Sequence, residues 1–368
     1  MAGCNGAVFK GNWENINMYI FITGVAGFIG SNFVYHYLDI HPEDIIIGYD
    51  ALTYAGNPEN LAALPEDQKS RFIFIKGDIT DPEQVQSIFS RYDIQGVINF
   101  AAESHVDRSI HDPAIFLKTN ILGTHTLLDA AQAAWRKNGT WKKNTTFLQV
   151  STDEVYGSLG PTGLFSETTP LDPHSPYSAS KAGSDLIAKA YHDTFGIPLV
   201  ITRCSNNYGP YQFPEKLIPL TITRALEHQS IPVYGDGRQI RDWLYVMDHC
   251  RAIDLAFHKG KPGEVYNIGG SNERENIIIV KTILRLLHEM TGDPEINESL
   301  ITYVTDRLGH DRRYAIDASK IKREFGWAPQ TPFEEGIRKT IRWYLEHQSW
   351  VKSVISGEYL SFYQKNYG

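Results

Sequence analysis

Two short stretches of the chain carry side chains that could move protons: STDEVYG at 151–157 and SPYSASK at 175–181. The first places Asp153 and Glu154 side by side after the strand-like sequence FLQVS. Two adjacent carboxyl groups repel each other if both are ionised, so the pair favours one neutral acid and one charged base. This pair is therefore a candidate for acid–base catalysis.

The second stretch places Tyr177 and Lys181 four residues apart on one face of a helix that we expect to begin near Tyr177. A lysine ammonium beside a tyrosine hydroxyl favours the phenolate and should lower the pKa of the phenol toward working pH. Such a phenolate can accept a proton from a sugar hydroxyl while a hydride leaves the same carbon. Taken alone, however, the spacing is more typical of an exposed helical pair.

A third stretch, TGVAGFIG at 23–30, has the spacing of a phosphate-binding turn between an apolar segment and an amphipathic helix. Its three glycines let the backbone turn tightly and approach a pyrophosphate, whose charge faces the helix N-terminus. No Gly-Lys-Ser/Thr follows, which excludes a Walker-type loop. The remaining alternative is a glycine-rich turn without a ligand.

Asp50 decides between these alternatives, because it ends the next apolar segment at the position where a dinucleotide's ribose would lie. Its carboxylate can accept hydrogen bonds from the ribose hydroxyls and would repel a 2′-phosphate. The pattern therefore predicts binding of NAD rather than NADP.

The elements that must position these groups alternate between apolar strands and amphipathic helices. Nearly continuous apolar strands of this kind predict a doubly wound (Rossmann) α/β fold, with a parallel sheet covered on both faces and ligands at the strands' carboxyl ends. The expected strands are 18–23, 45–50, 71–78, 97–102, 147–151 and 198–203, and the expected helices are one ending near Leu38, then 82–91, 113–135 and one from Tyr177.

Beyond about residue 205, proline and glycine become more frequent and the strands shorten, which indicates a smaller α/β substrate-binding domain. Helices are expected at 215–228, 276–290 and 331–347. We therefore expect a disordered leader or tag at 1–17, an NAD-binding domain at 18–205 plus about 235–262, and a substrate-binding domain at about 206–234 plus 263–350.

The composition excludes several classes of function. A formal net charge of −8 argues against nucleic-acid and membrane-surface binding. The 3 cysteines are widely separated and form no CxxC, which fits a reducing cytoplasm and predicts no metal site. No apolar run approaches the length of a membrane span, and no signal peptide is visible, so we expect a cytoplasmic protein.

The motifs TGVAGFIGS, YSASK and STDEVYG together resemble the extended short-chain dehydrogenase/reductase superfamily. Within it, five stretches resemble the dTDP-glucose 4,6-dehydratase family: STDEVYG, NFAAESHVDRS (99–109), SNNYGPYQFPEKLIP (205–219), GDGRQIRDWLYV (235–246) and DRLGHDRRYAID (306–317). The resemblance runs from Met18 to about Trp343. The chain departs from the family at Leu308, where proline is common, and in its extra N-terminal segment.

This resemblance implies a lyase that converts dTDP-glucose to dTDP-4-keto-6-deoxyglucose and water, in the biosynthesis of a deoxysugar such as rhamnose. C4 is oxidised, water is eliminated across C5–C6 and the hydride returns to C6, so NAD is retained. The resemblance assigns the C4 hydroxyl proton to Tyr177, the C5 proton to Glu154 and the departing C6 hydroxyl to Asp153. Thr152 would hydrogen-bond the C4 hydroxyl and, with Lys181, complete the catalytic set.

The implied binding residues follow by motif position. With the turn glycines, the NAD contacts are Gly24, Gly27, Phe28, Ile29, Gly30, Asp50, Ala51, Leu52, Thr53, Asp78, Ile79, Phe100, Ala101, Ala102, Thr119, Tyr177, Lys181 and Asn207. The substrate contacts are Ser104, Thr152, Asn206, Lys216, Leu217, Pro232, Val233, Tyr234, Arg241, Asn276, Asp306, Arg307 and His310.

Three of the substrate contacts also have a physical rationale. The guanidinium groups of Arg241 and Arg307 suit a diphosphate because each can donate to two oxygens, and Tyr234 could pack on a thymine ring. Surface ion pairs are the alternative for the arginines. For His310 a structural role is an equal alternative.

A homodimer is also implied by the resemblance, with the helices at 113–135 and 177–195 pairing across a two-fold axis as a four-helix bundle. Their alanine-rich faces could equally lie against the sheet. Alternative functions are a nucleotide-sugar epimerase or decarboxylase, or a non-catalytic NAD-binding protein. The Asp153–Glu154 pair disfavours the first, and the intact set of five catalytic residues disfavours the second.

Overall fold

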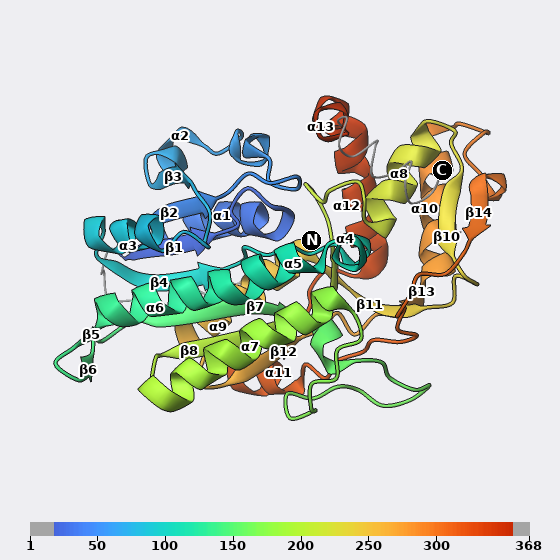
Figure 1. The fold of residues 1–368 in the computed structure, drawn as a ribbon. Helices are drawn as coiled ribbons and strands as arrows, with labels where there is room; N and C mark the ends of the chain where they lie inside the picture. The colour runs from blue at the N-terminus through green and yellow to red at the C-terminus, as the bar shows by residue number, and fades with distance from the viewer. Residues whose placement is uncertain (1–17, 356–368) are drawn as a thin grey trace, which may run out of the picture.

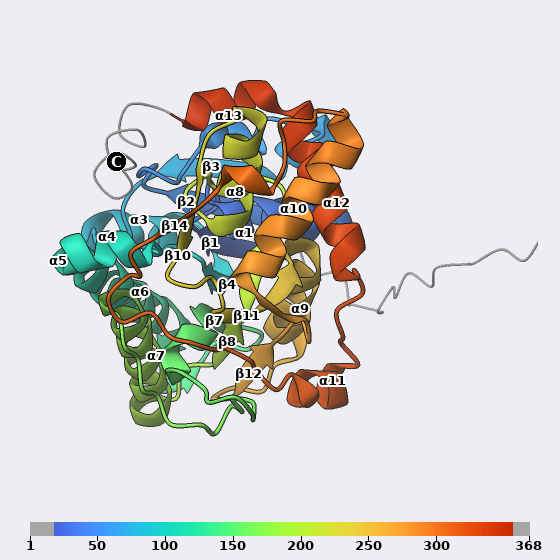
Figure 2. The same ribbon diagram turned by 90° about the vertical axis from the view of Figure 1, so that its right-hand side faces the viewer.

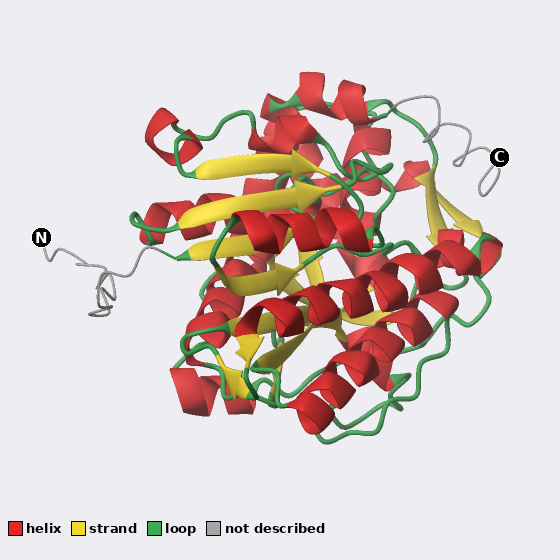
Figure 3. Ribbon diagram, turned by 60° about the vertical axis from the view of Figure 1, so that its left-hand side comes forward, coloured by secondary structure: helices red, strands yellow, loops and turns green. Residues whose placement is uncertain are grey.

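The structure is a computed structural model that describes residues 18–355, so the predicted leader at 1–17 lies outside the described residues. A seven-stranded parallel sheet in the order β12-β8-β7-β4-β1-β2-β3 forms its centre (Figures 1 and 3). The strands are β1 Tyr19–Thr23, β2 Ile45–Asp50, β3 Phe72–Lys76, β4 Ile94–Asn99, β7 Thr146–Thr152, β8 Leu199–Cys204 and β12 Val265–Ile268.

The strand order places the site. From β1 the chain winds outward to β2 and β3 and then returns to the other side of β1 as β4. Loops that leave neighbouring strands in opposite directions open a crevice at the carboxyl edge, which is where doubly wound sheets bind ligands. The six strands expected from the sequence are all present in this sheet, and the fold prediction is confirmed.

Helices cover both faces of the sheet. One face packs against α1 Phe28–Ile40, α9 Val246–Lys259 and α11 Ser319–Phe325. The opposite face packs against α3 Pro82–Arg91, α6 Thr124–Trp135 and α7 Pro176–Phe195. Both faces of each central strand are thus buried, which is why these strands are apolar along their whole length.

The helix expected at 113–135 is interrupted. It consists of α5 Pro113–Phe116, a π-helical segment η2 Leu117–Gly123, and α6. Within η2 the Asn120 side chain accepts a hydrogen bond from the Glu103 amide at 2.9 Å and donates to the Ser180 hydroxyl at 2.8 Å. This irregular turn therefore connects the loop after β4 to α7, and π-helical turns of this kind are frequent at functional sites.

A second, smaller core lies beyond the carboxyl edge of the sheet, at the right of Figure 1 and facing the viewer in Figure 2. It packs α8 Leu217–Leu226, α10 Asn276–Thr291, α12 Phe333–Glu346 and α13 Gln348–Val354 around two small sheets. These sheets are β10 Ile231–Tyr234 with β14 Ile301–Val304, and β13 Glu273–Glu275 with β11 Ile240–Tyr245 and β9 Asn206–Tyr208.

The remaining elements are short: η1 Pro58–Leu61, α2 Glu66–Lys69, α4 Val106–His111, β5 Arg136–Lys137, β6 Thr140–Trp141, η3 Asp153–Tyr156 and η4 Glu298–Leu300. None of the helices within 18–355 is both long and apolar enough to cross a membrane. The division into two domains stays a prediction. The predicted substrate-binding domain includes residues 263–268. Strand β12, Val265–Ile268, is however the edge strand of the large sheet, so a division based on the sheets would assign these residues to the NAD-binding domain.

Candidate functional site

The turn between β1 and α1 is built so that only glycine fits. Gly24 has φ +73°, and a Cβ atom there would lie 2.7 Å from the Ala101 amide nitrogen. A Cβ atom on Gly30 would lie 2.1 Å from the Gly24 carbonyl oxygen. Gly27 is the N-cap residue of α1 and offers no side-chain cap, so the first N–H groups of the helix, which line the crevice, are an anion-binding site.

Asp50 supports this turn from the end of β2. Its carboxylate accepts hydrogen bonds from the Ala26 amide at 2.9 Å and the Leu52 amide at 2.8 Å. Burial raises the pKa of Asp50. The side chain thus positions the turn, a structural role that the sequence did not predict, and it also lines the crevice where a ribose acceptor is expected.

A large cavity opens above this turn, and we call it the glycine-turn cavity. It is lined by the turn, Asp50, the loop after β4, and Tyr177 and Lys181 of α7. Every residue of the predicted cofactor set lines it except Leu52, which lies in the left-handed region at φ +55°. The close glycines and the N–H donors of the uncapped helix terminus fit a pyrophosphate, and the Asp50 carboxylate is an acceptor for ribose hydroxyls, so the cavity fits NAD.

A second cavity, which we call the arginine cavity, adjoins the first. Ten members of the predicted substrate set line it: Asn206, Lys216, Leu217, Pro232, Val233, Tyr234, Arg241, Asn276, Arg307 and His310. Ser104 and Thr152 line the glycine-turn cavity instead. Asp306 lines neither; its carboxylate contacts His310 Nδ1 at 2.6 Å and accepts from Gln239 at 3.0 Å.

The two cavities meet at Glu154, which lines both. Strand β7 ends at Thr152, and η3 then turns Asp153 and Glu154 in different directions. The Thr152 hydroxyl accepts a hydrogen bond from the Glu154 amide and donates one to Asp153 Oδ1, both at 3.3 Å. The adjacent carboxyl groups therefore occupy different surroundings.

Asp153 is the more enclosed of the two, with 1% of its surface exposed and no hydrogen-bond partner for Oδ2 among the described residues. Burial, followed by the charges of Glu154 and Asp242, raises the pKa of Asp153 well above its usual value. A carboxyl group held in this way is neutral and can donate a proton.

Glu154 faces three cations. Burial raises the pKa of Glu154 above its usual value, and the charges of Arg241, Lys216 and Arg307 offset only part of that rise. The cations favour an ionised Glu154 beside a neutral Asp153, which is the separation that a base and an acid in one site require.

Tyr177 and Lys181 lie at the start of α7, which a capping box between Ser175 and Ser178 fixes in place. Burial and the charge of Glu154 raise the pKa of Tyr177 well above its usual value, while a hydrogen bond with Thr152 lowers it. The Lys181 ammonium donates to the Val150 carbonyl at 2.7 Å. The predicted lowering of the Tyr177 pKa is therefore wrong for the chain's own groups, because burial and Glu154 dominate.

The arginines are held in place by the walls of their cavity. The Arg241 guanidinium donates to the Ile240 and Asp311 carbonyls and lies 4.2 Å above the Tyr314 ring. The Arg307 guanidinium lies 4.5 Å above the Tyr234 ring. Arg307 Nε also lies 3.3 Å from Asp107 Oδ1. Because these contacts orient both cations, little side-chain entropy remains to be lost on anion binding.

His310 lies against the same wall, with its ring in edge contact with Tyr234. Burial and the charge of Arg307 lower the pKa of His310 to about 4. A neutral imidazole in contact with Asp306 fits the structural alternative for this residue, although it still lines the cavity.

Sequence reasoning missed several residues that line the site, notably Gln212 and Glu215, which line both cavities. Glu215 is buried, accepts a hydrogen bond from the Tyr54 hydroxyl at 3.0 Å and lies 3.5 Å from Arg108 Nε. Both residues fall within SNNYGPYQFPEKLIP, next to the predicted Lys216. That position was the only signal for Glu215, because its partners Tyr54 and Arg108 are distant in the chain, whereas Gln212 donates to the nearby Asn207 carbonyl at 3.0 Å.

Comparison with known proteins adds independent support. The family model described as GDP-mannose 4,6 dehydratase matches residues 21–340. A dTDP-glucose 4,6-dehydratase of Xanthomonas campestris is 54% identical over 342 residues, covering 92% of this chain and 96% of the relative. The dTDP-glucose 4,6-dehydratase 1 of Escherichia coli is 51% identical over 360 residues, covering 95% and 99%.

Solved structures agree with these relatives. A dTDP-glucose 4,6-dehydratase from Bacillus anthracis in complex with NAD superimposes with a TM-score of 0.81 at 49% identity, covering 92% of this chain and 99% of that one. The Streptomyces venezuelae enzyme DesIV, with NAD and dTDP bound, gives a TM-score of 0.83 at 45% identity, covering 92% and 100%. The chain therefore belongs to the GDP-mannose 4,6 dehydratase family, an NAD-binding family of the short-chain dehydrogenase/reductase type, in which the dTDP-glucose 4,6-dehydratases are its relatives.

Proposed function

We propose that this enzyme converts dTDP-glucose to dTDP-4-keto-6-deoxyglucose and water, a step in the biosynthesis of a deoxysugar. The observation that carries the proposal is the Asp153–Glu154 pair at the junction of the two cavities. One member is enclosed and neutral, and the other faces three cations, so the chain supplies an acid and a base side by side. Loss of water from adjacent carbons needs both.

The glycine-turn cavity would hold NAD. The N-terminus of α1 would receive the pyrophosphate, Asp50 the adenosine ribose, and the residues after β4 together with Lys181 the nicotinamide half. When bound there, NAD supplies reversible two-electron chemistry at C4 and C6 of the sugar. The chain's own groups then have only protons to move.

Tyr177 accepts the proton of the C4 hydroxyl, with the Thr152 hydroxyl hydrogen-bonded beside it. Because burial and Glu154 raise the pKa of Tyr177, the phenol needs positive charge nearby to ionise. We expect Lys181, which is buried one turn further along α7, to supply part of that charge together with the positive nicotinamide ring of NAD. The four-residue spacing of Tyr177 and Lys181 therefore favours the phenolate only inside the buried site, where positive charge surrounds the phenol.

Glu154 removes the C5 proton, which a keto group at C4 makes acidic, and Asp153 protonates the departing C6 hydroxyl. The cations around Glu154 support its role as the base. The enclosure of Asp153 supports its role as the acid. An ionised Glu154 and a neutral Asp153 suit the order of the reaction, since the C5 proton must be removed before the C6 hydroxyl departs.

The arginine cavity would hold the nucleotide diphosphate. Arg241 and Arg307 would bind its oxygens, and Lys216, whose ammonium donates to the Ser104 carbonyl at 2.8 Å, adds a third charge between the cavities. Tyr234 would lie near the base. The Tyr234 hydroxyl donates to Asp107 at 3.1 Å, which fixes the ring before the nucleotide arrives.

The proposal is tested by incubating the protein with dTDP-glucose and measuring product mass, without added NAD. We expect loss of one water from the sugar, and the Tyr177→Phe variant as a control should lose it roughly 10²–10⁴-fold more slowly. Unchanged mass with intact, NAD-loaded protein would refute the activity.

An epimerase is the competing reading, because a UDP-glucose 4-epimerase from Thermotoga maritima is 30% identical with a TM-score of 0.78, covering 90% of this chain and 100% of that one. An epimerase would return the sugar at unchanged mass with inverted C4. The same mass measurement, followed by analysis of the sugar's configuration, therefore separates the two reactions.

We also propose that the protein is a homodimer through η2, α6 and α7. Among the large apolar side chains exposed in residues 18–355, five lie on these helices and the adjoining α5: Ile115, Leu117, Leu122, Leu186 and Phe195. Of the alanines considered from the sequence, Ala130 and Ala131 pack against the sheet, whereas Ala133, Ala179 and Ala190 are exposed. The exposed set supports pairing, and light scattering of a Leu186→Glu variant would test it.

A cytoplasmic location stays a prediction. It is supported by the two described cysteines, Cys204 and Cys250, which are free and buried thiols. Free thiols of this kind are typical of proteins in a reducing compartment.

A further inference from the structure

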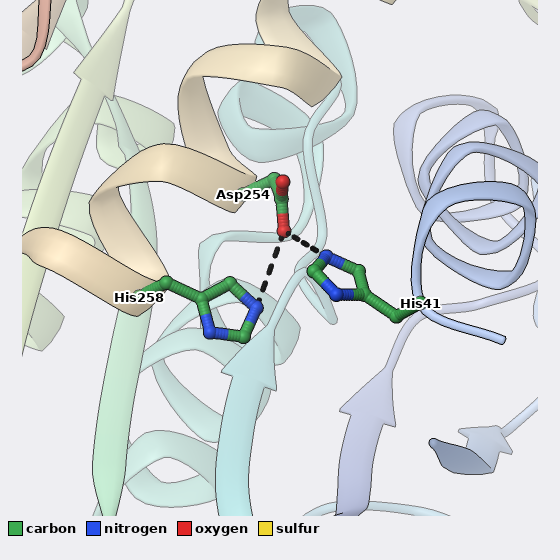
Figure 4. Close-up of side chains that lie close together, drawn as sticks. All are labelled: His41, Asp254 and His258. Carbon is green, nitrogen blue, oxygen red and sulfur yellow. Dashed lines mark hydrogen bonds and ion pairs between the residues drawn. The ribbon is translucent and has the colours of Figure 1, made fainter. Parts of the chain in front are cut away.

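His41, Asp254 and His258 form a compact cluster far along the chain from every residue of the catalytic set (Figure 4). His41 Nε2 lies 2.9 Å and His258 Nε2 lies 3.4 Å from the same oxygen, Oδ1 of Asp254. One ligand atom from each residue lies within 4.8 Å of the other two, and within residues 18–355 only this trio of His, Cys, Asp or Glu side chains meets that criterion.

The spacing suits a tetrahedral transition metal. Metal–ligand distances of about 2.0–2.1 Å place neighbouring ligand atoms of zinc about 3.3 Å apart. The two imidazole nitrogens lie close to that distance from the carboxylate oxygen, so small rotations of the side chains would enclose an ion. Asp254 and His258 are four residues apart on α9, a spacing that places two ligands on one helix face.

The third ligand is held by its surroundings. The Arg71 guanidinium donates to the Leu38 carbonyl at 2.8 Å and the His41 carbonyl at 3.0 Å, which fixes the end of α1. The Tyr37 ring packs on the His41 imidazole with centroids 4.2 Å apart. A site whose ligands are already oriented loses little entropy when a metal binds.

A fourth nitrogen lies nearby without a hydrogen bond. His36 Nε2 is enclosed, has no hydrogen-bond partner among the described residues, and lies 4.0 Å from the second oxygen of Asp254. Buried polar atoms normally have partners, so an orphan nitrogen facing this carboxylate is a second observation that points to a missing ligand.

From this cluster we infer that His41, Asp254 and His258 bind one zinc-like divalent transition metal ion, with His36 beside them. The ligands come from the ends of α1 and α9, which pack on the same face of the sheet. Both helices run back toward the amino edge of the strands, away from the cavities at the carboxyl edge. The ion would therefore join two helices and take no part in the reaction.

A purely hydrogen-bonded His–Asp–His cluster is the competing explanation, and zinc titration distinguishes the two. Chelator-stripped protein should bind one Zn²⁺ per chain by calorimetry, and the melting temperature should rise with Zn²⁺ but not with Mg²⁺, which disfavours imidazole ligands. Asp254→Asn and His258→Gln should each weaken zinc binding by about 100-fold or more, since even residues that only orient ligands are worth about 10–100-fold.

The matched control is His228→Gln, which removes an exposed histidine paired with Asp293 and should leave zinc affinity unchanged. Absence of zinc binding to the stripped wild-type chain, or equal affinity in the Asp254 and His258 variants, would overturn the inference. If a variant does not fold, Co²⁺ absorption of the wild-type protein decides the matter, because a site with two imidazoles and a carboxylate gives a tetrahedral spectrum. Dehydration rates should be the same with and without zinc.

Discussion

The two cavities that meet at Glu154 are built in opposite ways. The glycine-turn cavity is formed mainly by backbone at the ends of neighbouring strands, where Gly24 and Gly30 bring chain segments into contact. The arginine cavity is formed by long side chains from separate elements, such as Arg241 on β11 and Arg307 in the loop after β14. Substitutions that add atoms should therefore disrupt binding in the glycine-turn cavity, and substitutions that remove a charge should disrupt binding in the arginine cavity.

Glu154 is one of the residues that line both cavities, and of these it is the one next to Asp153. The arginine cavity supplies the cations that offset part of the rise that burial causes in the pKa of Glu154, and the glycine-turn cavity supplies Tyr177 and Lys181. A substitution in the arginine cavity should therefore change the pH dependence of the reaction, and a substitution in the glycine-turn cavity should change cofactor binding or hydride transfer.

Tyr177→Phe should reduce turnover by roughly 10²–10⁴-fold, the usual contribution of a positioned base, while substrate affinity stays near normal. Only the proton acceptor is removed, and the ring still fills its place. Steady-state kinetics with a separate measurement of nucleotide-sugar binding provides the check. Turnover close to that of the wild type would eliminate the phenolate role.

Glu154→Gln should stall elimination, by about 10²-fold or more, after C4 has been oxidised. The near-ultraviolet absorbance of reduced nicotinamide should then build up when substrate is added, and deuterium uptake at C5 from D₂O should fall. Asp153→Asn is the matched control, because it should leave removal of the C5 proton intact and slow only the departure of the C6 hydroxyl. Reduced cofactor building up in the Asp153 variant alone would reverse the two assignments.

Gly24→Ala should abolish NAD binding and destabilise the fold by about 1–3 kcal/mol, since the new Cβ atom meets the Ala101 backbone and the φ is strained. Gly139→Ala is the control for strain alone, because Gly139 has φ +80° with nothing within 4 Å of the added atom. It should cost about 1 kcal/mol and leave NAD binding unchanged. Thermal melts and NAD titration distinguish them; equal effects would mean that close approach is unimportant.

Asp50→Asn should weaken NAD binding by about tenfold or more, because hydrogen bonds to a charged group are worth about 1.5–3 kcal/mol. Asp50→Ala should weaken it further and also lower the melting temperature, since the Ala26 and Leu52 amides lose their acceptor. An arginine added nearby should raise tolerance of NADP. Unchanged NAD affinity in both variants would contradict the ribose assignment.

Arg241→Gln should shift the acidic limb of the kcat profile to higher pH, which is the smallest and most specific effect. Burial raises the pKa of Glu154, and Arg241 is the leading charge that lowers it. Activity needs ionised Glu154, so it is lost as pH falls through that pKa, and the loss begins earlier without Arg241.

Arg312→Gln is the control for this shift, because Arg312 is an exposed arginine paired with Asp236. The profile of that variant should match the wild type. An unshifted acidic limb in Arg241→Gln would mean that the arginine cavity binds substrate without adjusting the base.

The sequence by itself determined the local parts of this protein. The turn at 23–30, the strands and the spacing of Tyr177 and Lys181 each depend on neighbours within a few residues. The structure has them where the sequence predicts, except that β4 spans Ile94–Asn99 instead of 97–102. The cofactor set also came together, because parallel strands end at one edge and so collect their following residues. Periodicity and turn chemistry suffice for such features.

Only the tertiary structure decided what depends on burial and on distant partners. The pKa values of Asp153 and Glu154 separate because Asp242 lies near the first, whereas Lys216 and Arg307 lie near the second. The raised pKa of Tyr177 comes from burial first and from the charge of Glu154 second. The zinc-like cluster joins residues 213 positions apart in the chain. A pKa or a ligand set is fixed by charges and dielectric surroundings in space, and a linear sequence does not record those distances.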